Sequence, residues 1–527
     1  MSINRKTFII GLDGASWDLL NPLMDEGVMP NLKRIVDNGT SGNLLSTIPP
    51  YTAPAWVSCV TGVNPGKHGV FGFTVKKKGV PGANPQFVES SGVNVPKLWN
   101  YINNNGRTVG LINVPITYPA ETVNGFVVPC FLTPLKKVDY TYPVSIYREF
   151  LMPADYVINV RMAESHNPSV DAIPQIINAL MDMTQKRFQV MESLLKAYQP
   201  DFFMIVFTSL DKVQHKFWKY LDPNNPMYVS SVGENIRHHL TSIYNLMDRI
   251  IGKIIEGIDD LTTLYIVSDH GFCSKDKIFY INKWLAKNGY LKLKKTAMLK
   301  QHFFGGNSVK DFSDRNIDIL NHPIYRFVDM GKSCFIGSDP YEQGIYCIND
   351  MAEKKLDKLV QDLKGLKDNE TGLNLFKKVC RKSEIYSGDY AHMAPDVILQ
   401  MEDYSCDFVR GYTLRKGTIF RVKNAQGSHH PKGIFAAYGR DIAARKKVDA
   451  DIMDIAPTIL YNMGFPVSSI MDGKVLGEIF NNRFVETNEI KREDYTISSG
   501  TKQSSPVYTD EDKEEIAARL GELGYLD

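Results

Sequence analysis

The sequence predicts an α/β fold with a mostly parallel central sheet, helices on both faces of that sheet and a smaller inserted region. Three apolar, β-branched segments, at 7–13, 201–211 and 262–269, predict buried strands, and each ends in an aspartate. Two long segments between them, at 175–198 and 232–258, carry apolar residues at helical spacing. Strands that alternate with helices are typical of a parallel, doubly wound sheet.

This alternation also predicts how the chain divides. A length of 527 residues suffices for one large α/β domain with a substantial insertion, or for two to three domains. We expect residues 1–271 and 426–527 to form the core, because the strand and helix pattern runs through both. Residues 272–425 break the pattern, so we expect them to form an inserted region, either a cap or an extension of the sheet, that completes one edge of the site.

Composition and charge exclude several classes of partner. The chain is 43% hydrophobic and 23% charged, which is typical of a soluble globular protein. Its net charge of +2 gives no electrostatic argument for binding a nucleic-acid duplex or an acidic membrane surface. Apolar runs are too short to cross a bilayer, and the first strand begins almost at the N-terminus, so we expect neither a transmembrane segment nor a signal peptide. The seven scattered cysteines contain no Cys-x-x-Cys pair and favour a reducing, cytoplasmic location.

The first strand stops abruptly at Asp13, which is followed by Gly14. A carboxylate at the carboxyl end of a buried strand lies where open α/β sheets place their ligands. A short helix is expected next, at 30–39, with Pro30 at its start and Gly39 at its end. Asp13 is therefore the first candidate site residue in the chain.

The segment at 49–62 predicts a helix with a hydroxyl at its start. Its leading prolines force an extended approach, and Thr52 suits the N-cap, with Pro54 in the first turn and Gly62 after the end. A hydroxyl in this position faces free N–H groups and the positive end of the helix dipole. Thr52 is thus a candidate nucleophile for attack on a phosphate, and a simple helix cap is the alternative.

Further elements complete the α/β pattern on either side of the inserted region. The segment at 117–170 has no clean periodicity. The remaining expected elements are helices at 95–105, 452–463 and 509–527 and strands at 108–115 and 433–439.

Three aspartates, Asp13, Asp211 and Asp269, end the three predicted strands. One such residue would most simply cap the following helix. Three are harder to explain in that way, because parallel strands would bring all three carboxylates to the same edge of the sheet. Adjacent negative charges at that edge require a cation.

Histidines accompany these aspartates. His215 follows Asp211 at i, i+4 spacing, which can place both side chains on one helix face, and His270 directly follows Asp269. His429 lies in a Gly-x-His segment before the last strand, where His430 is the alternative. Mixed Asp and His ligation suits zinc, and manganese or iron less well.

These side chains divide into two predicted ligand groups. Two divalent cations about 4 Å apart could hold the attacking and departing oxygens of an in-line displacement. One cation would help to deprotonate Thr52, a phosphothreonine intermediate would form, and water activated at the second site would hydrolyse it. The first group contains Asp13, Asp269, His270 and the Thr52 oxygen, and the second contains Asp211, His215 and His429.

Together the motifs resemble the type I phosphodiesterase/nucleotide pyrophosphatase branch of the alkaline phosphatase superfamily. Each motif alone is a weak signal, but the ordered set spans nearly the whole chain. The resemblance implies an alkaline-phosphatase-like fold, two metal ions (usually zinc, with manganese possible), a threonine nucleophile and hydrolysis of phosphodiester or pyrophosphate bonds in a small phosphate-ester substrate. The motifs are Asp13-Gly14, Thr52-Ala-Pro54, Thr61-Gly62 with His68-Gly69, Asp211-x-x-x-His215, Ser268-Asp-His-Gly271, Ala394-Pro-Asp396, Gly427-Ser-His429, Asp454-Ile-Ala-Pro457 and Leu523-Gly-Tyr-Leu526.

One departure from the family concerns the contact to the phosphate. The better-known nucleotide pyrophosphatases hold a phosphate oxygen with an Asn in the nucleophile's helix region, whereas this chain has no Asn between Thr52 and Gly62, and Ala55 follows Pro54. Backbone N–H groups or a side chain of the inserted region would then supply this contact. The sulfatase relatives carry Cys or Ser before x-Pro-x-Arg, so Thr52 and Trp56 argue against sulfate esters.

Two other functions remain open at this stage. A phosphomonoesterase or a phosphotransferase could use the same threonine and the same metals. A metal-stabilised binding protein that has lost catalysis is the non-enzymatic alternative, against which the complete ligand set argues.

Overall fold

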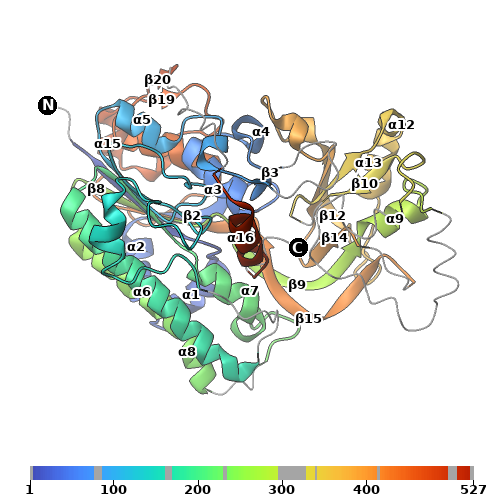
Figure 1. Ribbon diagram of the computed structural model, residues 1–527, viewed down its shortest axis with the longest axis horizontal. Helices are drawn as coiled ribbons and strands as arrows, with labels where there is room; N and C mark the ends of the chain where they lie inside the picture. Colours follow the sequence, from blue (N-terminus) through green and yellow to red (C-terminus); the bar gives the residue numbers. More distant parts are fainter. Residues whose placement is uncertain are drawn as a thin grey trace.

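The computed structural model has a larger body and a smaller lobe, which the long strands β9 (Gly271–Tyr280) and β15 (Ile419–His430) connect (Figure 1). The segment Leu523–Leu526, which contributes to the family resemblance, lies outside the described residues. The structure describes residues 4–75, 86–160, 169–229, 234–294, 328–338, 341–411, 416–495 and 507–522.

Nine strands of the described chain form one large sheet with β1 (Lys6–Leu12) near its centre. This strand is parallel to β7 (Phe202–Phe207) on one side and to β8 (Thr262–Val267) on the other. The only antiparallel member among the described strands is β16 (Lys432–Tyr438), so the sheet is mostly parallel, which confirms the predicted fold class. The order is β17-β2-β16-β8-β1-β7-β5-β6, with β18 beside β2; the other strands are β2 (Thr40–Leu45), β5 (Val109–Ile112), β6 (Gly125–Val128), β17 (Lys446–Lys447) and β18 (Ala450–Asp451).

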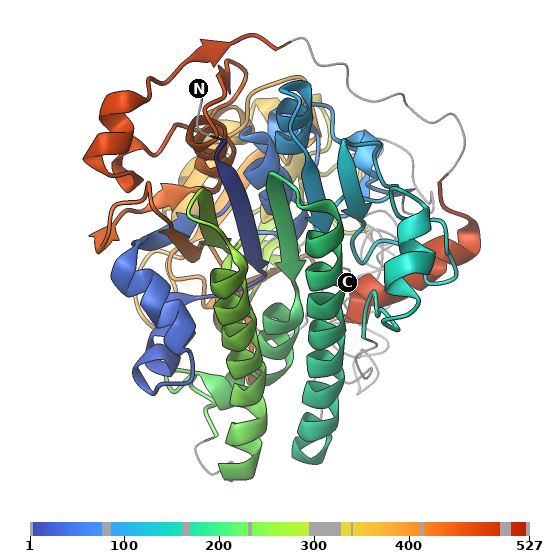
Figure 2. The same ribbon diagram turned by 90° about the vertical axis from the view of Figure 1, so that its left-hand side faces the viewer.

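Helices cover both faces of this sheet. Successive side chains of β1 enter different hydrophobic clusters, because strand residues alternate between faces: Ile10 joins one cluster and Ile9 the other. The two longest helices of the first face lie side by side, α6 in teal and α8 in green (Figure 2). The first face carries α1 (Trp17–Asp25), α2 (Pro30–Asn38), α6 (Ile173–Tyr198), α7 (Ser209–Leu221) and α8 (Glu234–Gly257), and the second carries α3 (Thr52–Thr61), α5 (Leu98–Asn104) and α14 (Ile455–Asn462).

The second predicted strand is shorter than expected. It ends at Phe207, and Asp211 is the third residue of α7 rather than the end of a strand. The reason is a change of period, because Leu210, Val213 and Phe217 recur at helical spacing and are buried on one helix face. Asp211 nevertheless lies just beyond the carboxyl end of the strand, so it stays at the predicted edge of the sheet.

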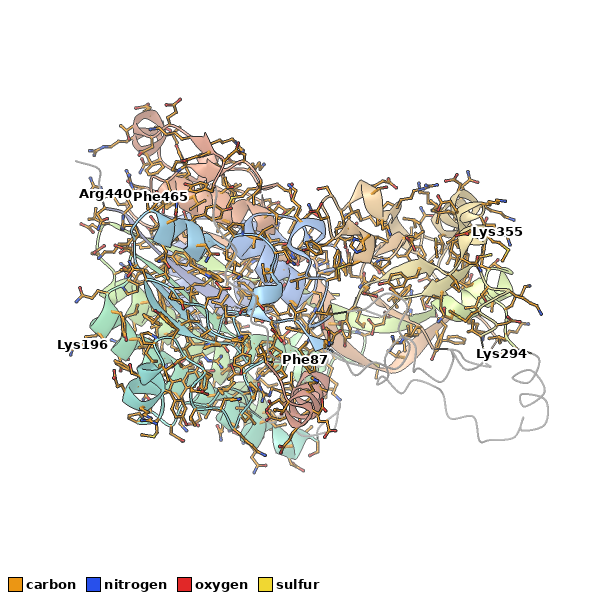
Figure 3. All side chains as sticks on the ribbon, turned by 45° about the horizontal axis from the view of Figure 1, so that its top comes forward. Phe87, Lys196, Lys294, Lys355, Arg440 and Phe465 are labelled. Carbon is orange, nitrogen blue, oxygen red and sulfur yellow. The ribbon has the colours of Figure 1, made fainter. Side chains whose placement is uncertain are left out.

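Residues between β8 and β16 form two smaller sheets and a separate hydrophobic cluster. In one sheet, β9 pairs with β14 (Cys406–Val409) and β15. The labels Lys294 and Lys355 lie on this smaller lobe, whereas Lys196 and Arg440 lie on the larger body (Figure 3). On these grounds we propose that 272–425 is the inserted region. The other elements of this region are β10 (Phe335–Gly337), β11 (Gly344–Cys347), β12 (Phe376–Arg381), β13 (Val397–Met401), α9 (Ile281–Lys287), α12 (Asp350–Glu353) and α13 (Leu356–Lys364).

The tail helix α16 (Asp510–Glu522) is anchored to the body rather than lying loosely on its surface. Its buried Arg519 donates hydrogen bonds to the carbonyl oxygens of Phe131 and Thr133. Across the described part of the chain, no helix combines the length and the apolar character that crossing a bilayer requires.

Candidate active site

Asp13 and Asp269 come together because β1 and β8 are adjacent and parallel. Each residue follows the end of its strand, and both side chains are fully buried. Gly14 has a φ of 71°, which permits the sharp turn directly after Asp13. The backbone N–H of Gly14 then donates a hydrogen bond to Asp269 Oδ1 at 3.2 Å, so the turn also orients the second carboxylate.

Thr52 begins α3, but it does not cap this helix. The extended residue Tyr51 holds the N-cap position, so the predicted capping role of Thr52 is wrong by one residue. Tyr51 has the extended backbone that is typical of an N-cap residue, and Thr52 is already helical. The Thr52 hydroxyl is fully buried and lies 3.1 Å from His270 Nε2, so it faces the acidic edge of the sheet instead of the helix backbone.

The second predicted group converges in the same way. Asp211 and His215 lie one turn apart on α7, with His215 Nε2 3.3 Å from Asp211 Oδ1. His429, on β15, brings its Nε2 to 3.6 Å from the same oxygen and to 3.0 Å from His215 Nε2. The alternative, His430, instead contacts the ring of Tyr404.

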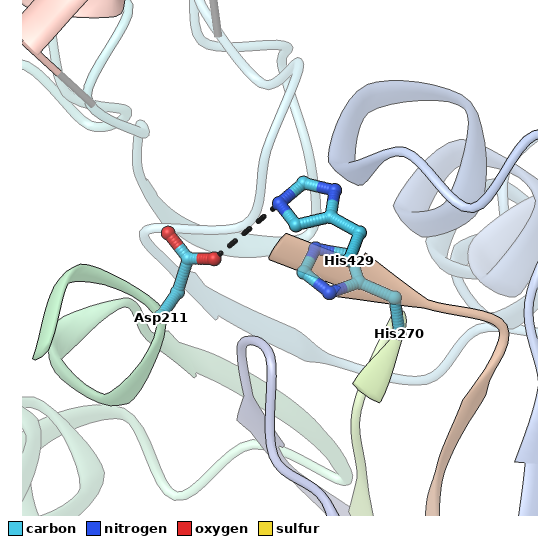
Figure 4. Close-up of side chains that lie close together, drawn as sticks. All are labelled: Asp211, His270 and His429. Carbon is cyan, nitrogen blue, oxygen red and sulfur yellow. Dashed lines mark ion pairs between the residues drawn. The ribbon is translucent and has the colours of Figure 1, made fainter. Parts of the chain in front are cut away.

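His270 lies beside both groups. Its ring stacks on that of His429 with the centroids 3.6 Å apart, and the contact between His429 Nε2 and Asp211 Oδ1 is drawn beside it as a dashed line (Figure 4). Ligand atoms of Asp211, His270 and His429 lie within 4.8 Å of one another, and so do those of Asp13, Asp269 and His270. All seven predicted site residues therefore meet at one place, and His270 borders both groups rather than one.

Burial and the charges of neighbouring groups shift the pKa values of the three carboxyl groups. Burial, together with the charges of Asp269 and Asp211, raises the pKa of Asp13 well above its usual value. Burial and then Asp211 raise the pKa of Asp269 to about 7. Burial would also raise the pKa of Asp211, but His215 and His429 hold it well below the usual value. A set of buried carboxyl groups of this kind is stable in its ionised form only beside positive charge.

The imidazoles are held in the form that binds metals. Burial lowers the pKa of His270 to about 4, and burial with the charge of His270 lowers the pKa of His429 to about 3, so both rings are neutral at pH 7. The Nδ1 of His429 lies 3.1 Å from the carbonyl oxygen of Pro50, and that of His270 lies 3.1 Å from the carbonyl oxygen of Gly271. Because a carbonyl oxygen only accepts, each Nδ1 carries the proton and each Nε2 presents a lone pair.

These donors fit divalent cations. Asp13 Oδ1 and Asp269 Oδ2 are buried and accept no hydrogen bond from any described residue. The Nε2 atoms of His215 and His429 lie 3.0 Å apart, close enough to bind the same cation. Neutral imidazoles and carboxylates around one buried space are the donor set that zinc and manganese take in proteins.

Two further side chains support the site, and the sequence analysis did not single them out for it. Trp56 Nε1 donates a hydrogen bond to Asp13 Oδ2 at 3.4 Å. Its position, four residues after Thr52 on the same helix face, was a signal that could have identified it. Tyr341, from the inserted region, stacks on Tyr51 with ring centroids 4.8 Å apart, and no sequence pattern connects these two residues.

Trp56→Phe is expected to weaken metal binding about tenfold to a hundredfold, because hydrogen bonds to a ligating carboxylate fix its orientation. Titration of the metal-free variant with zinc would measure this change. The matched control is Trp99→Phe, which also removes a buried indole hydrogen bond to a carboxylate, that of Glu121, but away from the site. Equal zinc affinity of the two variants would show that Trp56 does not help Asp13 to bind metal.

The fold and the converging residues define an alkaline-phosphatase-like α/β protein with a candidate dinuclear metal centre. The chain belongs to the type I phosphodiesterase / nucleotide pyrophosphatase family, whose sequence pattern matches residues 7–431. This membership confirms the resemblance found in the sequence and indicates hydrolysis of phosphoesters. None of the curated protein sequences compared with the chain matches it.

One solved structure supports the fold, that of phosphonoacetate hydrolase. Phosphonoacetate hydrolase from Sinorhizobium meliloti 1021, in complex with phosphonoformate, is 15% identical with a TM-score of 0.51, over 87% of this chain and 95% of the other. Human ectonucleotide pyrophosphatase / phosphodiesterase 5 is 12% identical with a TM-score of 0.49, over 91% of this chain and all of the other. At these identities the likeness concerns the fold alone.

Proposed function

We propose that this protein hydrolyses phosphodiester or pyrophosphate bonds through a phosphothreonine intermediate on Thr52. The observation that carries the proposal is the position of the Thr52 hydroxyl, which is buried at the start of α3 and 3.1 Å from His270. No helix cap uses this hydroxyl, and its neighbour His270 belongs to both candidate ligand groups. Family membership supports the same class of reaction.

We further propose that two divalent cations, zinc with manganese as the alternative, complete the site. When bound, such ions lower the pKa of a coordinated hydroxyl or water and neutralise charge on the phosphate. The residues proposed to hold them are Asp13, Thr52, Asp211, His215, Asp269, His270 and His429.

The proposed reaction has two displacement steps at phosphorus, both of which use the Thr52 oxygen. Thr52 Oγ1 forms a bond to phosphorus and loses its proton, while the bond from phosphorus to the leaving oxygen breaks and that oxygen takes up a proton. Water then attacks the phosphorus of the phosphothreonine, which still carries the second substituent of the substrate; this step releases that half as a phosphate monoester and returns a proton to the Thr52 oxygen. The N–H groups in the first turn of α3 lack partners within the helix, so they can donate to a phosphate oxygen in place of the missing Asn.

Diesters are expected to be better substrates than monoesters. Tyr341 stacks on Tyr51 next to the nucleophile and offers aromatic surface to a second ester substituent. We expect kcat/KM for bis-p-nitrophenyl phosphate to exceed that for p-nitrophenyl phosphate by a few-fold to about tenfold, since one aromatic ring contact is worth about 0.5–1.5 kcal/mol. The reverse ranking would favour the alternative, a phosphomonoesterase or phosphotransferase.

A direct screen of the purified protein would identify its natural substrate class. Phosphodiesters, nucleotides, phosphonates and sulfate esters form the test set. Phosphonates belong in it because a structure of similar fold is that of phosphonoacetate hydrolase. Turnover of sulfate esters alone would contradict the proposal.

We also propose a cytoplasmic location from the cysteine pattern, which fractionation of the native cells would test.

A further inference from the structure

The segment that leads into the nucleophile helix has few backbone donors of its own. It consists of Ile48, Pro49, Pro50 and Tyr51, and the two prolines have no N–H group. Its position therefore depends on the groups that donate to its carbonyl oxygens. Because Thr52 follows directly, any shift of this segment moves the proposed nucleophile.

A side chain lies within hydrogen-bonding distance of each carbonyl oxygen of residues 48–50. Thr47, directly before the segment, donates its hydroxyl to the middle one at 2.8 Å. The Nδ1 of His429 lies 3.1 Å from the last one. The first, that of Ile48, accepts a hydrogen bond from the hydroxyl of Tyr386. Of these three side chains, that of Tyr386 comes from the smaller lobe.

The contact of Tyr386 is a packed contact between the lobe and the body. Tyr386 lies in the connection between β12 and β13 and is 4% exposed. Its ring packs edge-on against that of Phe71, with the centroids 5.3 Å apart. Ile48 and Phe71 also pack against a small hydrophobic cluster that contains Tyr386 and the lobe residue Ile398. The hydroxyl of Tyr386 is therefore held in place by its buried ring.

The lobe also binds the short helix α4 (Pro65–His68), which follows α3. The N–H of Ser387 donates to Asn64 Oδ1 at 3.3 Å, and Asn64 Nδ2 donates to Ser387 Oγ at 3.1 Å. The N–H of Tyr390 donates to the carbonyl oxygen of Gly66 at 2.8 Å. The same lobe segment thus contacts the chain both before and after the nucleophile helix.

We infer that Tyr386 is a positioning residue for Thr52, because its hydroxyl holds the carbonyl oxygen of Ile48 and so fixes the start of the nucleophile helix. The inference rests on the proposed function and adds the smaller lobe to the parts of the chain on which the reaction depends. A nucleophile that is displaced by about 1 Å loses on the order of a hundredfold in rate. Since Tyr386 acts through the backbone, its loss should slow attack on phosphorus without weakening the binding of substrate or metal.

Tyr386→Phe tests this role, because it removes the hydroxyl and keeps the buried ring. With the zinc-loaded protein, we expect the first release of p-nitrophenolate from bis-p-nitrophenyl phosphate, measured before steady state, to slow by about tenfold to a hundredfold. The half-saturating substrate concentration and the zinc content should stay within about twofold. The matched control is Tyr290→Phe, which should keep the rate: Tyr290 is buried in the same lobe and donates its hydroxyl to Asp362 Oδ2 at 2.6 Å, away from the nucleophile helix.

A second pair of variants displaces the lobe without removing a hydrogen-bonding group. Gly388 has a φ of 106°, and a Cβ at this position would lie 2.8 Å from the carbonyl oxygen of Gly66 beside α4. Gly372 also has a positive φ, 71°, but a Cβ there would meet no atom of the described chain within 4 Å. Both alanine variants place a side chain where the backbone favours glycine, yet only Gly388→Ala should slow the first release of p-nitrophenolate.

An unchanged rate in Tyr386→Phe or in Gly388→Ala would overturn the inference. A loss of rate that Tyr290→Phe or Gly372→Ala shares would also contradict it, because the effect would then reflect the general stability of the lobe. Thr52→Ala tests the proposed function separately. If Thr52→Ala is inactive while Tyr386→Phe keeps the full rate, the inference alone is refuted; if Thr52→Ala is fully active, the proposed function fails.

Discussion

Thr52→Ala is expected to lower the hydrolysis of bis-p-nitrophenyl phosphate by on the order of 10⁴-fold or more, the scale seen when a catalytic nucleophile is removed. The hydroxyl is fully buried beside His270, which borders both ligand groups, and no helix cap depends on it. Its loss should therefore abolish attack on phosphorus and leave α3 intact. Steady-state kinetics of the purified variant would measure the change.

Thr61→Ala is the matched control for this substitution. Thr61 is buried in the same helix and donates its hydroxyl to the carbonyl oxygen of Val57, so its loss removes a methyl group and a hydroxyl outside the site. The control should retain activity, and metal content should stay near normal in both variants. Unchanged turnover in Thr52→Ala would exclude Thr52 as the nucleophile.

Removal of bound metal is expected to lower activity by about a thousandfold or more, which corresponds to the several kcal/mol of transition-state stabilisation that such ions supply. Bound cations would neutralise an anionic phosphate beside Asp211, whereas without them burial favours the protonated forms of Asp13 and Asp269. Chelation followed by dialysis, with activity measured before and after the addition of zinc or manganese, tests this expectation.

A pair of histidine variants separates loss of metal from general damage. His215→Ala should lose zinc affinity and activity together, because His215 Nε2 faces the ligand atoms of Asp211 and His429. His239→Ala should lose neither, because the ring of His239 contacts the backbone of its own helix, at Asn235. Activity that persists after complete removal of metal would defeat the two-cation proposal.

The fold was largely predictable because its pattern is local. The apolar run of β1 and the helical spacing in α6 and α8 are strong signals, and their alternation indicates a parallel sheet. The end of β7 was predicted too late: the apolar run stops at Phe207, and Thr208 and Ser209, residue types common at helix starts, already mark the beginning of α7. Element boundaries depend on tertiary packing that a single sequence does not contain.

The site was predictable where a residue's neighbours in sequence carry the signal. Asp13, Asp269 and His270 follow strand ends, and strand order then brings them together. The position of His270 between both groups depends on its stacking with His429, which comes from a distant strand, so the sequence could place it in one group only.

The burial of Arg187 and Lys212 was not predictable from the sequence. Each residue lies within an amphipathic helix where a basic side chain predicts a solvated face. Only the packing of α6 and α7 against the sheet reveals that both side chains are buried. Tyr341 is a similar case, since its contact with Tyr51 depends on how the inserted region folds back.

Anomalous diffraction at the zinc edge, from crystals of the zinc-loaded protein, tests the two-metal centre most directly. We expect two peaks beside the Thr52 hydroxyl, one against Asp13 and Asp269 and one against Asp211, His215 and His429. A crystal that binds zinc only elsewhere, or not at all between these side chains, would contradict the proposed centre and the chemistry built on it.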